Sequence, residues 1–111
     1  GLVTSRLAYT TKQGLEKYDL KDYFDVVVTA EDTKKHKPDP EPVNIALAKL
    51  DSRPEQSLML GDTMFDILCA KNAGVTSVLV GWSLALKSGD DFGEEAPDHV
   101  IRKAGELLEL L

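Results

Sequence analysis

The 111-residue chain has the length of one modest domain, and its composition, 42% hydrophobic and 29% charged, is typical of a soluble globular protein. A formal net charge of −6 argues against a nucleic-acid partner, because phosphate backbones are bound by basic surfaces. The longest apolar run, around Val75 to Trp82, is far shorter than the roughly 20 residues of a membrane-spanning helix. No nucleic acid and no membrane are therefore expected as partners, whereas a small anionic substrate remains compatible with the charge.

Four short runs rich in apolar and β-branched residues alternate with longer segments of helical spacing. Each run is nearly continuous in hydrophobicity, which is typical of strands buried on both faces of a parallel sheet. The helical segments between them are the crossover connections that parallel strands need. The pattern predicts an α/β fold with a parallel sheet and flanking helices. The expected strands are Leu2–Thr4, Phe24–Thr29, Ser57–Gly61 and Thr76–Gly81.

The predicted helices follow these strands. The first covers Arg6–Tyr18 and the third covers Met64–Asn72, where an Ala-Gly pair supplies the C-terminal cap. The second starts within Lys37–Pro42, where Asp39 can cap it and both following prolines fit the first turn. No repeat or linker divides the chain, so we expect one domain over residues 1–111. The C-terminal part of the chain is expected to begin with a polar loop over Trp82–Pro97. A short strand over Asp98–Ile101 and a helix over Lys103–Leu111 are expected to follow.

Cys69 is the single cysteine of the sequence, so no internal disulfide is possible. This usage predicts a reduced, cytoplasmic setting. Because Cys69 lies in an apolar helical stretch, we expect it to be a small buried hydrophobic residue. The chain begins abruptly within the first predicted strand and lacks the pattern of a signal peptide, so we expect the natural start to lie upstream.

The densest group of candidate functional residues follows the third predicted strand. That strand places Asp62 at its carboxyl end, and Asp66 lies four residues later on the same helix face, near enough to return to Asp62. Two carboxylates at the end of a parallel strand suit Mg²⁺, which takes hard oxygen ligands in octahedral geometry. The alternative is that Asp62 caps the helix and Asp66 only favours its positive end.

Three further candidates lie, like Asp62, at the end of a predicted strand or in the loop just beyond it: Thr4, Ser5 and Lys37. Thr4 ends the first strand and Ser5 follows it, so a hydroxyl and free N–H groups converge at a helix start, where anions bind; ordinary N-capping is the alternative. Lys37 precedes a proline, which favours an extended backbone and projects the ammonium from the loop, although a lone lysine there is more typical of solvated surface. Together, these residues fall at the strand ends where open α/β sheets bind ligands.

Taken in order, the residues resemble motifs II, III and IV of the haloacid dehalogenase superfamily. The similarity spans nearly the whole chain and implies a Rossmann-like, HAD-type core domain, of which residues 1–111 are the C-terminal part. Gly81-Trp82 and Pro97-Asp98 are further similar to the branch of phosphoglycolate phosphatases and bacterial pyrophosphatases. The segments that carry the resemblance are Leu2-Val3-Thr4-Ser5, Lys37-Pro38-Asp39-Pro40, Gly61-Asp62-Thr63-Met64-Phe65-Asp66-Ile67 and Ala70-Lys71-Asn72-Ala73-Gly74.

The resemblance implies a magnesium-dependent phosphatase that transfers the phosphoryl group through an aspartyl-phosphate. By position in the motifs, Thr4 would bond the phosphoryl oxygens, aided by the Ser5 backbone, and Lys37 would offset charge on the nucleophile and phosphate. Asp62 would bind Mg²⁺, and Asp66 would support the metal directly or through water. The implied cofactor is Mg²⁺, and the implied partner is a small phosphorylated substrate.

The first motif of the family, Asp-x-Asp-x-Thr, occurs nowhere in the 111 residues. Because that motif carries the nucleophile and the acid/base, the chain by itself is expected to lack turnover. The family sheet also places the strand of this motif centrally, between the strands that end at Thr4 and Asp62. Without it, two buried strand edges would carry unpaired backbone groups, so we expect completion by a longer chain or by self-association.

Two other interpretations remain open. A receiver-like signalling domain uses the same residue types, but it places its acidic pair first and its lysine last, whereas here the order is Thr4, Lys37, Asp62 and Asp66. A non-catalytic phosphate-binding or interaction module is the second, and an upstream Asp-x-Asp pair would argue against it. The substrate is open as well, because the substrate-selecting cap of this branch lies between the first and second motifs.

Overall fold

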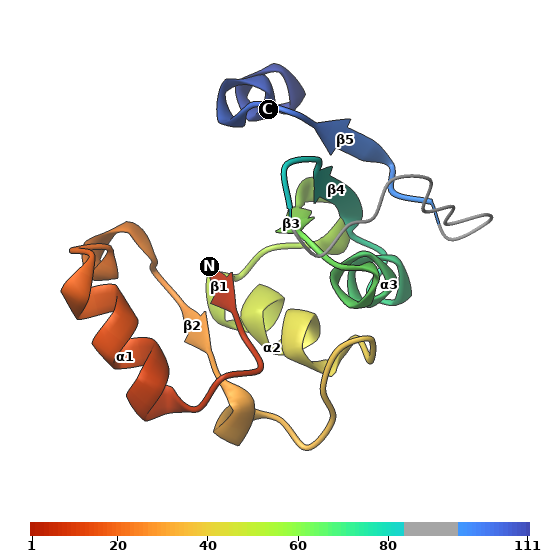
Figure 1. Cartoon of the computed structure of the whole chain (residues 1–111). Helices are drawn as coiled ribbons and strands as arrows, with labels where there is room; N and C mark the ends of the chain where they lie inside the picture. The colour runs from red at the N-terminus through yellow and green to blue at the C-terminus, as the bar shows by residue number, and fades with distance from the viewer. Residues whose placement is uncertain (84–95) are drawn as a thin grey trace.

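The computed structural model describes residues 1–83 and 96–111, so most of the loop predicted over Trp82–Pro97 lies outside the described residues. The described part contains two parallel sheets (Figure 1). The predicted α/β class with parallel strands and flanking helices is confirmed, although every strand is shorter than expected. One sheet pairs β1 (Leu2–Val3) with β2 (Val27–Val28), and the other has the order β3 (Leu58–Gly61), β4 (Thr76–Val80), β5 (His99–Ile101).

The α-helices of the described chain are α1 (Ala8–Lys17), α2 (Glu41–Leu50) and α3 (Met64–Asn72). Helix α1 begins two residues later than predicted, because Leu7 is extended at the capping position and donates no side-chain cap. At α2, Pro40 occupies the capping position, while Asp39 Oδ1 accepts the Glu41 N–H at 2.9 Å. The predicted last helix is a 3₁₀ helix over Ala104–Leu110. Among the described helices, none has the length and apolar character needed to cross a bilayer.

The main hydrophobic core joins α2 to α3. Val43 and Leu47 of α2 pack with Cys69 and Ala70 of α3 and with Val75, all of them buried. Helix α3 also packs on β3 and β4, and α2 contacts β1 and β2. Helix α2 therefore connects the two sheets, as its central place in Figure 1 shows. The prediction that Cys69 is a buried, unpaired cysteine is confirmed.

An apolar groove of about 350 Å³ lies between the two sheets. Within the described residues, β1 pairs only with β2, and β3 pairs only with β4, so one edge of each strand lacks a neighbour. Both strands line the groove, and α2 contributes Val43, Ala46, Leu47 and Leu50. The strands that the family resemblance places on either side of a further strand thus do not pair with each other.

Asp98 fastens β5 to β4 through a reciprocal set of hydrogen bonds with Ser77. Its Oδ2 accepts the Ser77 N–H at 2.8 Å and the Ser77 hydroxyl at 3.1 Å, and its own N–H donates to Ser77 Oγ at 3.0 Å. Ser77 is fully buried. The carboxylate of Asp98 therefore satisfies two donors that water does not reach in the folded chain.

We expect Asp98→Ala to lower the free energy of unfolding by about 1–3 kcal/mol, because buried donors on Ser77 would lose their acceptor. The Ser77 amide lowers the pKa of Asp98 despite the opposing effect of desolvation. Its contribution is therefore complete above the carboxyl's ordinary value of 3.8 and is lost as the pH falls below it. Urea denaturation of both forms across this range measures the effect. Glu109→Ala, at an exposed acid of the 3₁₀ helix, is the control, and an equal loss there would contradict the assignment.

Candidate active site

The turn between β3 and α3 is organised by the Asp66 carboxylate. Thr63 caps α3, with its Oγ1 accepting the Asp66 N–H at 3.4 Å, and Asp66 Oδ2 accepts the Thr63 N–H at 3.2 Å in return. The same Oδ2 accepts the Thr63 hydroxyl at 3.1 Å and the Asp62 N–H at 3.1 Å. This is a capping box, in which side chains satisfy N–H groups that have no helical partner. The predicted alternative was that Asp62 caps the helix and Asp66 favours its positive end. The cap is Thr63 and not Asp62, so that part is wrong, whereas Asp66 does stabilise the helix start.

Gly61 makes this arrangement possible. A Cβ atom at position 61 would lie 2.2 Å from Asp66 Cβ and 2.8 Å from Asp66 Oδ2, closer than real contacts allow. The Asp66 side chain therefore occupies the space that any other residue at the end of β3 would need. From the sequence, Gly61 was expected only as the last residue of the third strand, so this constraint was not predicted.

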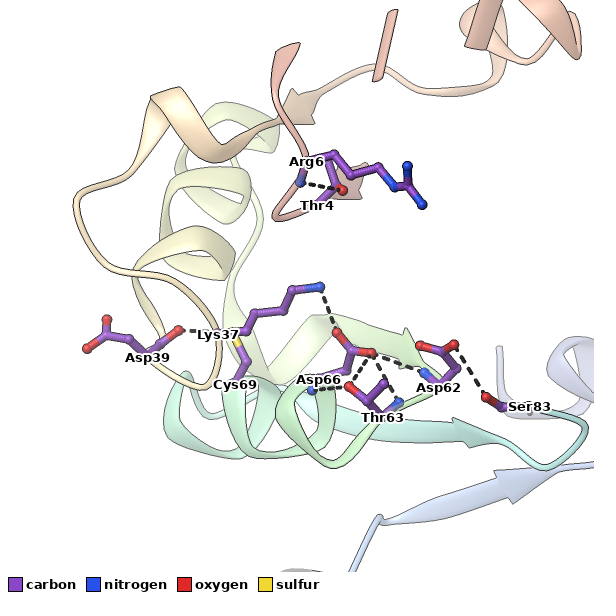
Figure 2. Close-up of polar contacts among 9 residues, drawn as sticks. All are labelled: Thr4, Arg6, Lys37, Asp39, Asp62, Thr63, Asp66, Cys69 and Ser83. Carbon is purple, nitrogen blue, oxygen red and sulfur yellow. Dashed lines mark hydrogen bonds and ion pairs between the residues drawn. The ribbon is translucent and has the colours of Figure 1, made fainter. Parts of the chain in front are cut away.

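Lys37 reaches Asp66 from the loop between η2 (Ala30–Asp32) and α2. Its Nζ lies 2.7 Å from Asp66 Oδ1, and the two side chains are 17% and 9% exposed (Figure 2). Burial by itself would raise the pKa of Asp66, but the hydrogen bond and charge of Lys37 and the Asp62 amide outweigh it and hold that pKa below its ordinary value. The structure thus brings together two predicted site residues that are 29 positions apart.

Asp62 has a different environment from Asp66. It is exposed at the end of β3, and its Oδ2 accepts a hydrogen bond from the Ser83 hydroxyl at 3.3 Å. Both oxygens of Asp66, by contrast, are already engaged by protein donors. The described residues contain no group of three His, Cys, Asp or Glu side chains that could hold a metal. Asp62 is therefore the carboxylate of this pair that fits Mg²⁺, an ion that commonly keeps several waters and binds substrate phosphate.

Thr4 lies at the end of β1, on the other sheet. Its N–H donates to Val28 O at 3.0 Å, and its Oγ1 accepts the Arg6 N–H at 3.1 Å. Figure 2 shows Thr4 and Arg6 across from Lys37, Asp66 and Asp62, so the end of β1 faces the Lys37 loop, the end of β3 and the start of α3. Ser5, which follows Thr4, is exposed.

Four contributors to the site were not predicted: Thr63, Ser83, Cys69 and Asn72. Thr63 had a signal, since Thr-x-x-Asp before an apolar run resembles the start of a capped helix. Cys69 and Asn72 donate to backbone carbonyls of the Lys37 loop, at Asp39 and Pro38. No local pattern reveals such contacts, because they join segments that are about 30 residues apart.

Comparison with known proteins gives the family. The model of the haloacid dehalogenase-like hydrolases matches residues 1–80, so the chain belongs to this family. Pyrophosphatase PpaX of Bacillus mycoides is 41% identical over 111 residues, which are 100% of this chain and 51% of that protein. The chain therefore spans about half the length of the curated relatives it matches.

Solved structures agree with this assignment. The structure of a provisionally named phosphoglycolate phosphatase from Lactobacillus plantarum matches with a TM-score of 0.85 and 31% identity, over 98% of this chain and 51% of that one. The HAD-hydrolase-type protein YfnB of Bacillus subtilis, described as bound to magnesium, matches with a TM-score of 0.82 and 26% identity. That match covers 98% of this chain and 47% of the YfnB chain. These likenesses support the Rossmann-like HAD fold and the branch that the sequence motifs indicated.

We expect Gly61→Ala to destabilise the fold by about 1–3 kcal/mol, because the added methyl group forces Asp66 out of its position. Gly14→Ala is the matched control: a Cβ on Gly14 in α1 meets nothing within 4 Å, so that change should add about 0.5–1 kcal/mol of stability. Chemical denaturation of the three proteins decides the matter. Equal stability of the wild type and Gly61→Ala would contradict the close approach.

A double-mutant cycle with Lys37→Met and Asp66→Asn should give a coupling energy of about 1–3 kcal/mol, since the contact is mostly shielded from water. The Arg53–Glu55 pair is a suitable control, with a distance of 3.6 Å and side chains 71% and 66% exposed. Its coupling should not exceed about 0.5 kcal/mol, because solvent screens exposed pairs. Similar coupling in both cycles would show that the Lys37–Asp66 contact has no special weight.

Proposed function

We propose that the protein to which this chain belongs is a magnesium-dependent phosphatase that hydrolyses a small phosphate ester or pyrophosphate through an aspartyl-phosphate. The observation that carries this proposal is the contact of Lys37 with Asp66, whose other carboxylate oxygen accepts the Asp62 N–H at the carboxyl end of β3. A cation and an exposed carboxylate at this edge suit a phosphoryl group with its metal. Family membership and the phosphatase names of similar proteins support the same reaction class.

Each residue has a defined task in this proposal. Asp62 would hold Mg²⁺, which when bound supplies Lewis-acid stabilisation of the phosphoryl oxygens. Lys37 would offset the charge that builds up on the nucleophile and phosphate, in a position already fixed by Asp66. Thr4, with the backbone N–H of Ser5, would hydrogen-bond the phosphoryl oxygens from the opposite sheet. Asp66 would act by orienting Lys37 and the Asp62 backbone, which places it at the metal site indirectly.

The nucleophile would come from outside these 111 residues, which contain no Asp-x-Asp pair. The apolar groove between β1 and β3 is the expected position of the strand that carries it, because both bordering strands have an edge to offer. By this proposal, the 111-residue chain supplies phosphate and metal contacts and is inactive alone. Pairing between two copies through the same edges is the alternative way to fill the groove.

The test is phosphate release by the full-length protein with Mg²⁺, using pyrophosphate and phosphoglycolate as substrates. Lys37→Met should lower kcat about 10²- to 10³-fold, as loss of one preorganised charge contact commonly does. Asp62→Asn should raise the Mg²⁺ concentration required for half-maximal activity. Lys35→Met changes a lysine two positions away whose side chain is 72% exposed, and it should leave both quantities unchanged.

Unchanged activity and metal affinity in Asp62→Asn would remove Asp62 from its role. A full-length protein without phosphatase activity that still binds inorganic phosphate through Lys37 would support the other proposal, a non-catalytic phosphate-binding module. The absence of a nucleophile from the chain is the observation that keeps this second candidate. An Asp-x-Asp pair in the full-length sequence would favour the enzyme.

A further inference from the structure

The loop over residues 33–40 has to place a long, flexible side chain accurately. Its backbone forms only bends and turns, and it lies between η2 and α2. A lysine has four carbons between backbone and ammonium, so fixing its Nζ in one place costs conformational entropy. The 2.7 Å contact between Lys37 and Asp66 therefore needs a backbone that is itself held in position.

Helix α3 supplies three successive contacts to this loop. Asp66 Oδ1 bonds the ammonium of Lys37 at 2.7 Å, Cys69 Sγ donates to Asp39 O at 3.0 Å, and Asn72 Nδ2 donates to Pro38 O at 3.1 Å. The three helix residues are spaced by three positions, so each lies beside the next on the helix surface. Helix α3 thus holds the side chain of Lys37 and the backbone carbonyls of Pro38 and Asp39.

The first half of the loop is held by a different element. Glu41, at the start of α2, accepts the N–H groups of Lys34 and Lys35 at 3.0 and 3.2 Å. Asp39 is also held from this side, because its Oδ1 accepts the Glu41 N–H at 2.9 Å and its Oδ2 lies 4.0 Å from the Lys35 ammonium. The Lys37 ammonium and the carbonyls of Pro38 and Asp39 are bonded from α3 instead. Release of the α3 contacts should therefore affect Lys37 more than the backbone of Lys34 and Lys35.

We propose that Asn72 is a positioning residue for Lys37, and that its amide, together with the Cys69 thiol, holds the Lys37-Pro38-Asp39 backbone against α3. Asn72 is exposed, so its substitution removes a hydrogen bond without opening the core. Cys69 is fully buried, and burial raises the pKa of its thiol to about 11, which keeps the S–H donor protonated at neutral pH. A thiol is a weak donor, so the amide of Asn72 makes the stronger of the two contacts.

The first test uses the full-length protein and trace labelling with acetic anhydride, read by peptide mass spectrometry. The side chain of Lys37 is 17% exposed and is paired with Asp66, whereas the side chain of Lys35 is 72% exposed, so Lys37 should react more slowly than Lys35. Asn72→Ala should raise the Lys37-to-Lys35 labelling ratio about threefold, the size expected from losing one partly solvated hydrogen bond. Asn72→Gln, which keeps an amide donor, should restore part of the difference.

Asn44→Ala is the matched control, since Asn44 is an exposed asparagine of α2 whose side chain makes no hydrogen bond within the described residues. It should leave the labelling ratio at the wild-type value. An unchanged ratio in Asn72→Ala would overturn the proposal, as would an equal rise in Asn44→Ala. Hydrogen exchange of the α3 amides in the same samples separates local release of the loop from general unfolding. Loss of protection throughout α3 would also count against a positioning role.

The second test is kinetic and rests on the proposed phosphatase function. In the full-length protein, Asn72→Ala should lower kcat about 3- to 10-fold with little change in KM, because a misplaced ammonium acts on the transition state. Asn72→Gln should recover activity, and Asn44→Ala should keep it. A fall in kcat that Asn72→Gln does not reverse would contradict positioning. If the wild type lacks phosphatase activity, the proposed function fails, while the labelling ratio still decides the role of Asn72.

Discussion

The contact between Lys37 and Asp66 is the interaction on which the rest of the site depends. Asp66 accepts four hydrogen bonds, from the Lys37 ammonium, the N–H groups of Asp62 and Thr63, and the Thr63 hydroxyl. A mostly buried carboxylate is costly unless its charge is paired and its oxygens are satisfied. The charge of Asp66 is paired with Lys37, and both of its oxygens accept hydrogen bonds. Asp66 therefore holds the loop of Lys37, the end of β3 and the start of α3 in fixed positions relative to one another.

This arrangement gives Asp62 and Asp66 different environments. Asp62 and Asp66 are four residues apart and look equivalent in sequence. In the fold, Asp66 is surrounded by donors of the protein. Asp62 is exposed, and within the described part of the chain its carboxylate accepts a hydrogen bond only from the Ser83 hydroxyl. An acceptor with unused lone pairs is what a hard cation requires. The difference in environment is what the proposed metal role of Asp62 requires, and it shows Asp66 as the residue that organises the turn around Asp62.

Much of this could be predicted from local patterns. Buried apolar runs predicted the positions of the strands, and helical spacing predicted α3 with its observed first and last residues. The third predicted strand correctly placed Asp62 just beyond the carboxyl end of β3. The contact of Lys37 with Asp66 could not be predicted from the residues alone, because it joins segments 29 positions apart. The close approach at Gly61 was also hidden, since it depends on where the Asp66 side chain folds back. The last helix was expected from its apolar residues, but its 3₁₀ form depends on backbone geometry that composition does not encode.

The direction of β1 and β3 determines where a further strand in the groove would end. β1 pairs with β2, and β3 with β4, in parallel register, and Thr4 and Asp62 follow β1 and β3 at their carboxyl ends. A further strand bonded in parallel to both free edges would end at the same side of the sheet as these two residues. A side chain at its carboxyl end would then lie between Thr4 on one side and Asp62 and Lys37 on the other. The apolar lining of the groove would bury the side chains along such a strand. A reactive side chain at the carboxyl end of that strand would then lie next to the polar groups of Thr4, Asp62 and Lys37.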